Sequence, residues 1–99
     1  DRQMMEADVM LVIIANISRK TGELIHNPDL ISRGFVYMKE NKKLIEMTRQ
    51  KAKNILKDHN PKTSPDEQII REKLRNEIGK FLFQKTEKRP MILPVIIEV

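Results

Sequence analysis

The chain has 99 residues, enough for one domain with a modest core, and its charged fraction of 33% and hydrophobic fraction of 39% fit a folded protein. It contains 0 cysteines and no apolar run close to the ~20 residues that span a bilayer, which excludes disulfides, a thiolate nucleophile and a transmembrane helix. The net charge of +5 comes mainly from residues 42–62, where 7 basic side chains accompany 2 acidic ones. This excess fits an anionic partner such as RNA, and it equally fits a solvated lysine-rich helix face.

These properties predict a single soluble domain over residues 1–99, located in the cytoplasm and without a membrane partner, since the first residues do not resemble a signal peptide. The chain begins at Asp1 without an initiator Met and stops on a strand-like apolar run that ends at Val99. We therefore expect it to be a piece cut from a longer polypeptide.

The first predicted element is a strand, because residues 9–14 are all apolar and mostly β-branched and the pattern continues to Ile17. Ser18–Glu23 is predicted to form a turn, in which Gly22 adopts a positive φ at no steric cost. The chain is then expected to return as a hairpin into Leu24–His26.

The second strand is predicted to be interrupted and then resumed. Asn27–Asp29 interrupts it, because Pro28 cannot donate a ladder hydrogen bond. Leu30–Tyr37 resumes it, and Gly34 in this stretch predicts a bulge or a close approach by another backbone.

Two helices follow, because the apolar period changes from two to about 3.6 residues. The first is expected from about Lys39 to Asp58. The second is expected to begin with Ser64 as N-cap, Pro65 at its first position and Glu67 completing a capping box, and to stop at Pro90. The predicted buried stripes are Leu44, Ile45, Thr48, Ala52, Ile55 and Leu56 in the first helix, and Ile70, Leu74, Ile78, Phe81 and Leu82 in the second.

The last predicted element is a strand over Met91–Val99, in which Pro94 favours an edge position. The predicted fold is therefore α+β with the order β-β-α-α-β. Because a connection of about six residues joins the helices, they are expected to lie antiparallel on one face of the sheet. The third strand is expected to run parallel to the first, which gives a three-stranded mixed sheet of order 2-1-3.

Two helices cover only one face of such a sheet, whereas the first and last strands are apolar on both faces. On the first strand, either the odd-numbered set or the set of Met10, Val12 and Ile14 can point outward. We expect a second copy of the domain, a neighbouring domain of the parent chain, or both, to cover this side, since monomers rarely expose such a patch. Strand twist and long Lys and Arg stems are the alternative cover. The interface candidates are Leu11, Ile13, Leu93, Val95, Ile97, Ser32, Arg33 and Gly34.

Two polar features are candidates for binding. Arg33 either anchors a carboxylate or phosphate through its planar fork or makes a local structural bond at a bulge. The RNA-contact candidates share one face of the first helix and would act as salt-sensitive point charges; they are Lys42, Arg49, Lys53 and Lys57. Sequence-specific RNA readout is not predicted, because three of the four aromatic residues fit a core better than a base-stacking platform.

No catalytic, metal or cofactor site is predicted in this chain. A catalytic zinc site needs three protein ligands, and the two histidines, His26 and His59, are far apart and belong to no ligand-spaced motif. The sequence also lacks a Gly-rich phosphate loop and a nucleophile elbow.

Four segments of the chain match one known family. They are Asp1-Arg2, Lys20-Thr21-Gly22, Pro28–Tyr37 and Arg89–Val99. In this order they resemble the C-terminal domain of bacterial ribonuclease J, a metallo-β-lactamase-superfamily ribonuclease, and the resemblance covers nearly the whole chain. The sequence departs from the family at Val9, since a Gly commonly follows the acid that is Asp8 here, and residues 58–67 are generic.

The resemblance implies a parent with two zinc ions that acts as a 5′-to-3′ exoribonuclease and endoribonuclease in mRNA decay and rRNA maturation. The family's zinc ligands belong to an N-terminal segment that is not in this sequence, so none is carried over. This chain would be a non-catalytic accessory domain that supports oligomerisation and activity. Its partners would be a second copy and the parent's catalytic domain, with RNA as the parent's substrate. Direct RNA binding through the basic helix face is the alternative function.

Overall fold

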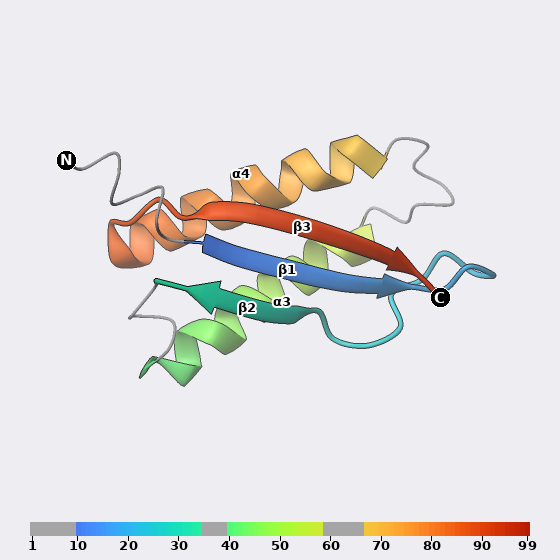
Figure 1. The fold of residues 1–99 in the computed structure, drawn as a ribbon, viewed down its shortest axis with the longest axis horizontal. Helices are drawn as coiled ribbons and strands as arrows, with labels where there is room; N and C mark the ends of the chain where they lie inside the picture. The colour runs from blue at the N-terminus through green and yellow to red at the C-terminus, as the bar shows by residue number, and fades with distance from the viewer. Residues whose placement is uncertain (1–9, 35–39, 59–66) are drawn as a thin grey trace.

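The computed structural model describes residues 10–34, 40–58 and 67–99. The elements are β1 (Met10–Ile17), β2 (Asp29–Arg33), α3 (Lys42–Asp58), α4 (Glu67–Thr86) and β3 (Met91–Glu98). They follow the predicted β-β-α-α-β order and form one sheet layer and one helix layer (Figure 1).

The sheet has the predicted order β2-β1-β3, with β2 antiparallel and β3 parallel to the central strand. In this register Val12 lies opposite Ile31 on one side and Leu93 on the other. Pro94 is on an edge strand, where a missing N–H is tolerated, so the predicted edge position is confirmed.

Both helices lie on the same side of the sheet and run antiparallel (Figure 1). Their predicted stripes are the buried residues, except that Ile45 and Phe81 are only half-buried. The core consists of Leu11, Ile13, Ala15, Leu44, Ala52, Ile55, Leu56, Ile70, Leu74, Ile78, Leu82 and Ile92. Thr48 is also buried, and its hydroxyl donates a hydrogen bond of 2.8 Å to the Leu44 carbonyl, which satisfies this polar group within α3.

The turn after β1 is built as predicted, but the second strand is shorter. Gly22 has a φ of 78°, and its N–H donates to the Ser18 carbonyl at 2.8 Å. After the turn, Leu24 forms one isolated bridge with Ile17, and regular pairing begins only at Asp29.

The end of the second strand also differs from the prediction. β2 ends at Arg33, and Gly34 follows it with a φ of 71°, so the glycine stands just after the strand and not inside it. The expected continuation through residues 35–37 lies outside the described residues.

Side-chain caps and backbone conformation set the helix ends. The Asn41 side-chain oxygen accepts a hydrogen bond of 3.0 Å from the Leu44 N–H, so Asn41 is the N-cap of α3, which begins at Lys42. The predicted start at about Lys39 lies outside the described residues. α4 ends at Thr86, four residues before Pro90, because Glu87 adopts a left-handed φ of 61°. The predicted cap at Ser64 and the predicted position of Pro65 lie outside the described residues.

Candidate functional site

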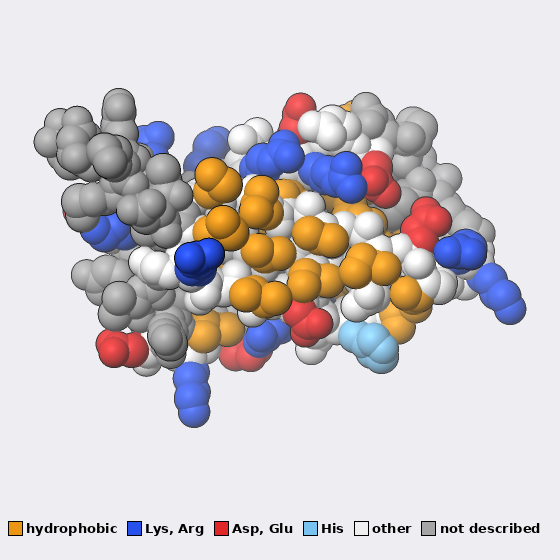
Figure 2. Space-filling view, viewed as in Figure 1, with side chains coloured by type: hydrophobic (Ala, Val, Ile, Leu, Met, Phe, Trp, Pro, Cys, Tyr) orange, Lys and Arg blue, Asp and Glu red, His pale blue; other side chains and the backbone are white. Residues whose placement is uncertain are grey.

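The sheet carries an apolar patch on the side away from the helices, the open face. Its residues are Met10, Val12, Ile14, Ile31, Met91, Leu93, Val95 and Ile97. The three β1 members are half-buried, the β3 members are 38–46% exposed, and Ile31 is 55% exposed. Figure 2 shows these hydrophobic side chains gathered over the sheet, with Lys and Arg side chains at the margin.

The register makes the open face continuous. Val12 stands between Ile31 and Leu93, and Ile14 lies opposite Val95. Directly opposed residues on neighbouring strands have Cβ atoms roughly 5 Å apart, so these side chains adjoin one another. The open face is therefore one surface and not a scatter of single exposed hydrophobic residues.

β2 places an acid and a base at opposite ends of the open face. Asp29 lies opposite Ile14, and Arg33 lies opposite Met10. Both side chains are therefore on the same side of the sheet as the apolar patch. Both are exposed, and neither forms an ion pair or side-chain hydrogen bond with another described residue. No local bond within the described residues therefore accounts for Arg33.

Two of the interface candidates on β1 are wrong. Leu11 and Ile13 are 0% exposed and pack in the core under the helices, so neither is available to a partner. Ser32 pairs with Leu11 and is half-buried on the same covered side, whereas Gly34 is exposed beyond the end of β2. The residues that β1 presents outward are the even-numbered ones.

The other three apolar candidates, Leu93, Val95 and Ile97, do lie on the open face. The sequence leaves open which side of β1 faces outward, and the outward set of Met10, Val12 and Ile14 is not among the predicted interface candidates. Asn16 is the sequence signal for this orientation. It alternates with Met10, Val12 and Ile14 on the same side of β1, and a polar residue in a strand marks the side that meets solvent.

The RNA-contact candidates on α3 have different surroundings. Lys42 is exposed at the start of the helix. The Arg49 side chain turns toward the sheet, where its Nε donates a 3.1 Å hydrogen bond to the Pro28 carbonyl and its guanidinium pairs with Glu46. Arg49 is thus committed to contacts within the chain.

The remaining two candidates, Lys53 and Lys57, lie together at a hollow of about 500 Å³ between α3 and the segment 22–27. Leu56 contributes an apolar wall, and the lining also includes His26 and the acidic Glu23. The hollow therefore combines cations with one anion, and its charge is less uniform than the helix sequence alone indicates.

The described part of the chain contains no group of three or more His, Cys, Asp or Glu residues that could hold a metal ion. None of its helices is long and apolar enough to cross a membrane. His59 lies outside the described residues.

Fold and surface together define a small two-layer α+β domain whose main surface feature is an exposed apolar sheet face. The family model for the ribonuclease J C-terminal domain matches residues 1–99 of this sequence, and the chain belongs to this family. The family expected from the sequence motifs is confirmed.

Curated relatives agree with this assignment. The chain is 28% identical over 99 residues to ribonuclease J2 of Bacillus subtilis (strain 168). It is 30% identical over 99 residues to ribonuclease J 2 of Staphylococcus epidermidis (strain ATCC 35984) and of Staphylococcus aureus (strain NCTC 8325). Each match covers 100% of this chain but 18% of the relative, so the chain spans less than a fifth of the length of these proteins.

Proposed function

We propose that this chain is a non-catalytic C-terminal accessory domain of a ribonuclease and that it self-associates through the open face. The observation that supports this most strongly is the row of large apolar side chains that remain 38–55% exposed on β2 and β3. Contiguous apolar patches on soluble proteins mark interaction sites, because covering them removes apolar surface from water.

Covering the open face contributes free energy of the size that a dimer needs. Full burial of a large apolar side chain is worth ~1.5–3 kcal/mol, so a side chain that is already half covered adds about 1 kcal/mol. The five exposed members of the open face, counted on two copies, thus give about 10 kcal/mol. Association itself costs ~4–15 kcal/mol. At the low end of this cost about 6 kcal/mol remains, so the isolated domain should dimerise weakly, with a dissociation constant of roughly tens of micromolar.

The charge pattern of β2 suits a second copy as the partner. Two sheets pack face to face about 10 Å apart with their strands nearly aligned. A two-fold axis in the interface plane and perpendicular to the strands lays β2 antiparallel over β2 of the second copy. Asp29 then lies opposite Arg33 of the second copy, and the two-fold axis makes this pair occur twice. An oppositely charged pair therefore stands at each end of the apolar centre.

In the parent protein, self-association would bring ribonuclease subunits together and support their activity. The family membership of the chain and the identity of its relatives as ribonucleases J support a ribonuclease parent. In this proposal the parent is a cytoplasmic, zinc-dependent 5′-to-3′ exoribonuclease and endoribonuclease of mRNA decay and rRNA maturation. Its two zinc ions and its catalytic residues lie outside this chain, and the chain alone should show no nuclease activity.

Sedimentation of the 99-residue chain across the micromolar range tests self-association. The unmodified chain should form dimers, and Leu93→Asp should be monomeric, because a carboxylate cannot be desolvated in the apolar centre. Ile69→Asp is the matched control, since Ile69 is 50% exposed on α4, outside the open face, and this variant should still dimerise.

A natively folded chain that is monomeric at every concentration would contradict the proposal. So would equal weakening by Leu93→Asp and Ile69→Asp. If the monomeric chain instead binds the catalytic part of the parent, and Leu93→Asp abolishes that binding, then a neighbouring domain covers the open face and a second copy does not.

Direct RNA binding through α3 is the second candidate function, favoured by the pairing of Lys53 and Lys57 at one hollow. Affinity for single-stranded RNA should then fall steeply with salt and with Lys53→Glu, because phosphate contacts release counterions. Absence of RNA binding at low salt would exclude this function.

A further inference from the structure

We propose that a basic hollow on α4 binds one nucleotide unit of single-stranded RNA, with the base against Phe83 and the phosphate among the surrounding cations. The hollow has a volume of about 340 Å³ and is formed by α4 together with the connection to β3. This size is at the lower end of pockets that hold small ligands. This hollow lies outside the open face, so binding there can be tested separately from self-association.

The aromatic member of the hollow is unusual because it is not used in the core. Phe83 is 39% exposed, whereas the buried stripe of α4 runs through Ile78 and Leu82. The Arg89 guanidinium lies 4.7 Å from the centre of the Phe83 ring. A flat ring together with a flat cation is the pair of surfaces on which unstacked bases rest.

The charge around Phe83 is of one sign. Arg75, Lys80 and Arg89 line the hollow, and its lining contains no acidic residue. Within the described residues the ion pairs are Arg49–Glu46 and Arg71–Glu67, so none of these three cations has an acidic partner there. Three unpaired cations beside an exposed ring favour a ligand that is both anionic and planar.

Gly79 opens the floor of the hollow. It is in the interior of α4, where a glycine costs about 1 kcal/mol relative to alanine. A Cβ built on Gly79 would meet no heavy atom within 4 Å, so packing within the chain does not demand a glycine. Arg75, Gly79 and Phe83 follow one another at i, i+4 spacing on one face of α4. Because Gly79 has no side chain, it leaves an open space between the side chains of Arg75 and Phe83.

An RNA nucleotide fits these features better than an acidic peptide does. Cations alone would serve both ligands, but an exposed ring stacked by a guanidinium and a backbone gap beside it accept a flat base. Asn76 in the lining adds an amide that can donate and accept hydrogen bonds at base edges.

Fluorescence anisotropy of a labelled single-stranded oligoadenylate with the 99-residue chain tests the site. Phe83→Leu keeps an apolar side chain but removes the ring, and it should weaken binding by roughly tenfold, the size of one base stack. Arg75→Gln should lower the slope of log affinity against log salt by about 0.7, the value for one phosphate contact on a single strand.

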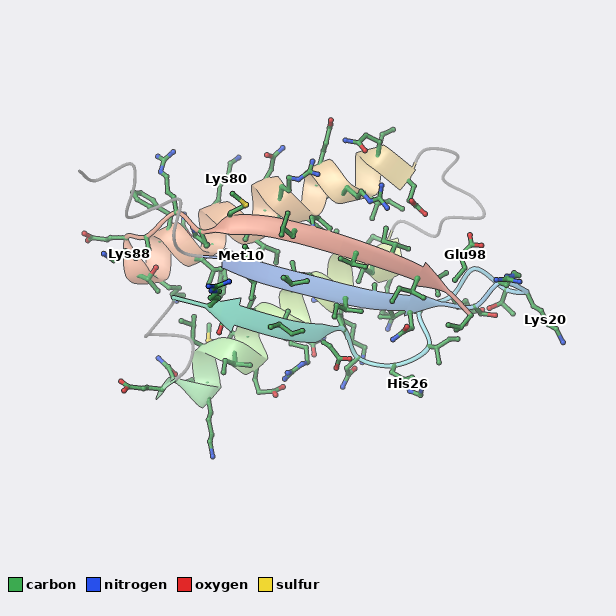
Figure 3. The ribbon with its side chains drawn as sticks, viewed as in Figure 1. Met10, Lys20, His26, Lys80, Lys88 and Glu98 are labelled. Carbon is green, nitrogen blue, oxygen red and sulfur yellow. The ribbon has the colours of Figure 1, made fainter. Side chains whose placement is uncertain are left out.

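Gly79→Gln separates binding from folding. It fills the hollow with a better helix former, so the unfolding midpoint should rise or hold while binding is lost. The control is Lys20→Gln, which removes a cation at the opposite end of the domain from Lys80 (Figure 3) and should leave the affinity within about twofold.

Three results would overturn the site. One is unchanged affinity in both Phe83→Leu and Gly79→Gln. The second is a loss that follows Lys53→Gln and not Arg75→Gln, which would assign RNA to the hollow on α3. The third is a short poly-glutamate peptide that binds as tightly as oligoadenylate and is equally insensitive to Phe83→Leu, which would make the surface a binding site for an acidic protein segment.

Discussion

Ile13 and Ile14 are neighbours of identical chemistry on β1, yet they meet different surroundings. Ile13 points to the helices and is 0% exposed, whereas Ile14 points to the open face and is half-buried. From Met10 to Ile14 the strand is apolar on both sides, so the helix layer decides which side becomes the core. The comparison shows that this chain covers one side of β1, and the proposed second copy would cover the other.

Replacing Ile13 and Ile14 separately by alanine should give the largest difference in unfolding free energy. Ile13→Ala should cost about 3 kcal/mol of unfolding free energy, because it leaves a cavity in a packed core. Ile14→Ala should cost about 1 kcal/mol in dilute solution, and more as protein concentration rises, because a second copy that binds only the folded state stabilises it. Urea unfolding at two protein concentrations measures both effects. Equal costs in dilute solution would mean that the chain itself covers the open face.

The helix layer can be weakened without touching the sheet. Asn41→Ala removes the side-chain acceptor of the Leu44 N–H and should cost about 1 kcal/mol of stability. Asn54→Ala on the exposed side of α3 is the control and should change stability by less than about 0.5 kcal/mol. Thermal unfolding followed by circular dichroism measures both, and an equal effect of the two substitutions would remove the capping role.

Charges at the ends of the open face should give the smallest effect. Asp29→Arg or Arg33→Asp alone should weaken self-association by about threefold, because exposed ion pairs contribute only ~0.2–1 kcal/mol each. The double variant Asp29→Arg/Arg33→Asp should restore the dimer, since each new pair has its charges reversed. Sedimentation at low salt measures the three variants. Failure of the double variant to recover would rule out the antiparallel arrangement of β2 over β2.

Much of this fold follows from residue patterns. The stripe of Ile70, Leu74, Ile78 and Leu82 identifies the buried side of α4, and Pro94 correctly marks β3 as an edge strand. The parity of β1 could not be derived from hydrophobicity, because Met10 to Ile14 are all apolar and both alternating sets satisfy the pattern. Contacts with the helices decide which set becomes buried, and within β1 the polar Asn16 is the sequence feature that indicates the outward side.

The candidate surfaces were less predictable than the fold. Helical spacing groups Arg49 with Lys53, but it does not show that Arg49 reaches the Pro28 carbonyl, a contact between residues 21 positions apart. Phe83 could have been noticed as an aromatic residue outside the stripe of α4. Its contact with Arg89 depends on how the chain turns at Glu87, where an acidic residue adopts a backbone conformation that favours glycine.

The most direct test of the open face as a dimer interface is a distance between two spin labels. Because the chain has 0 cysteines, Val12→Cys and Ile69→Cys each provide a single labelling site per copy. Pulsed electron paramagnetic resonance should give a distance between Val12 labels well below the 45 Å length of the domain, and a longer one between Ile69 labels. A dimer in which the Ile69 labels are the closer pair, or no dipolar coupling at all from the Val12 labels, would contradict self-association through the open face.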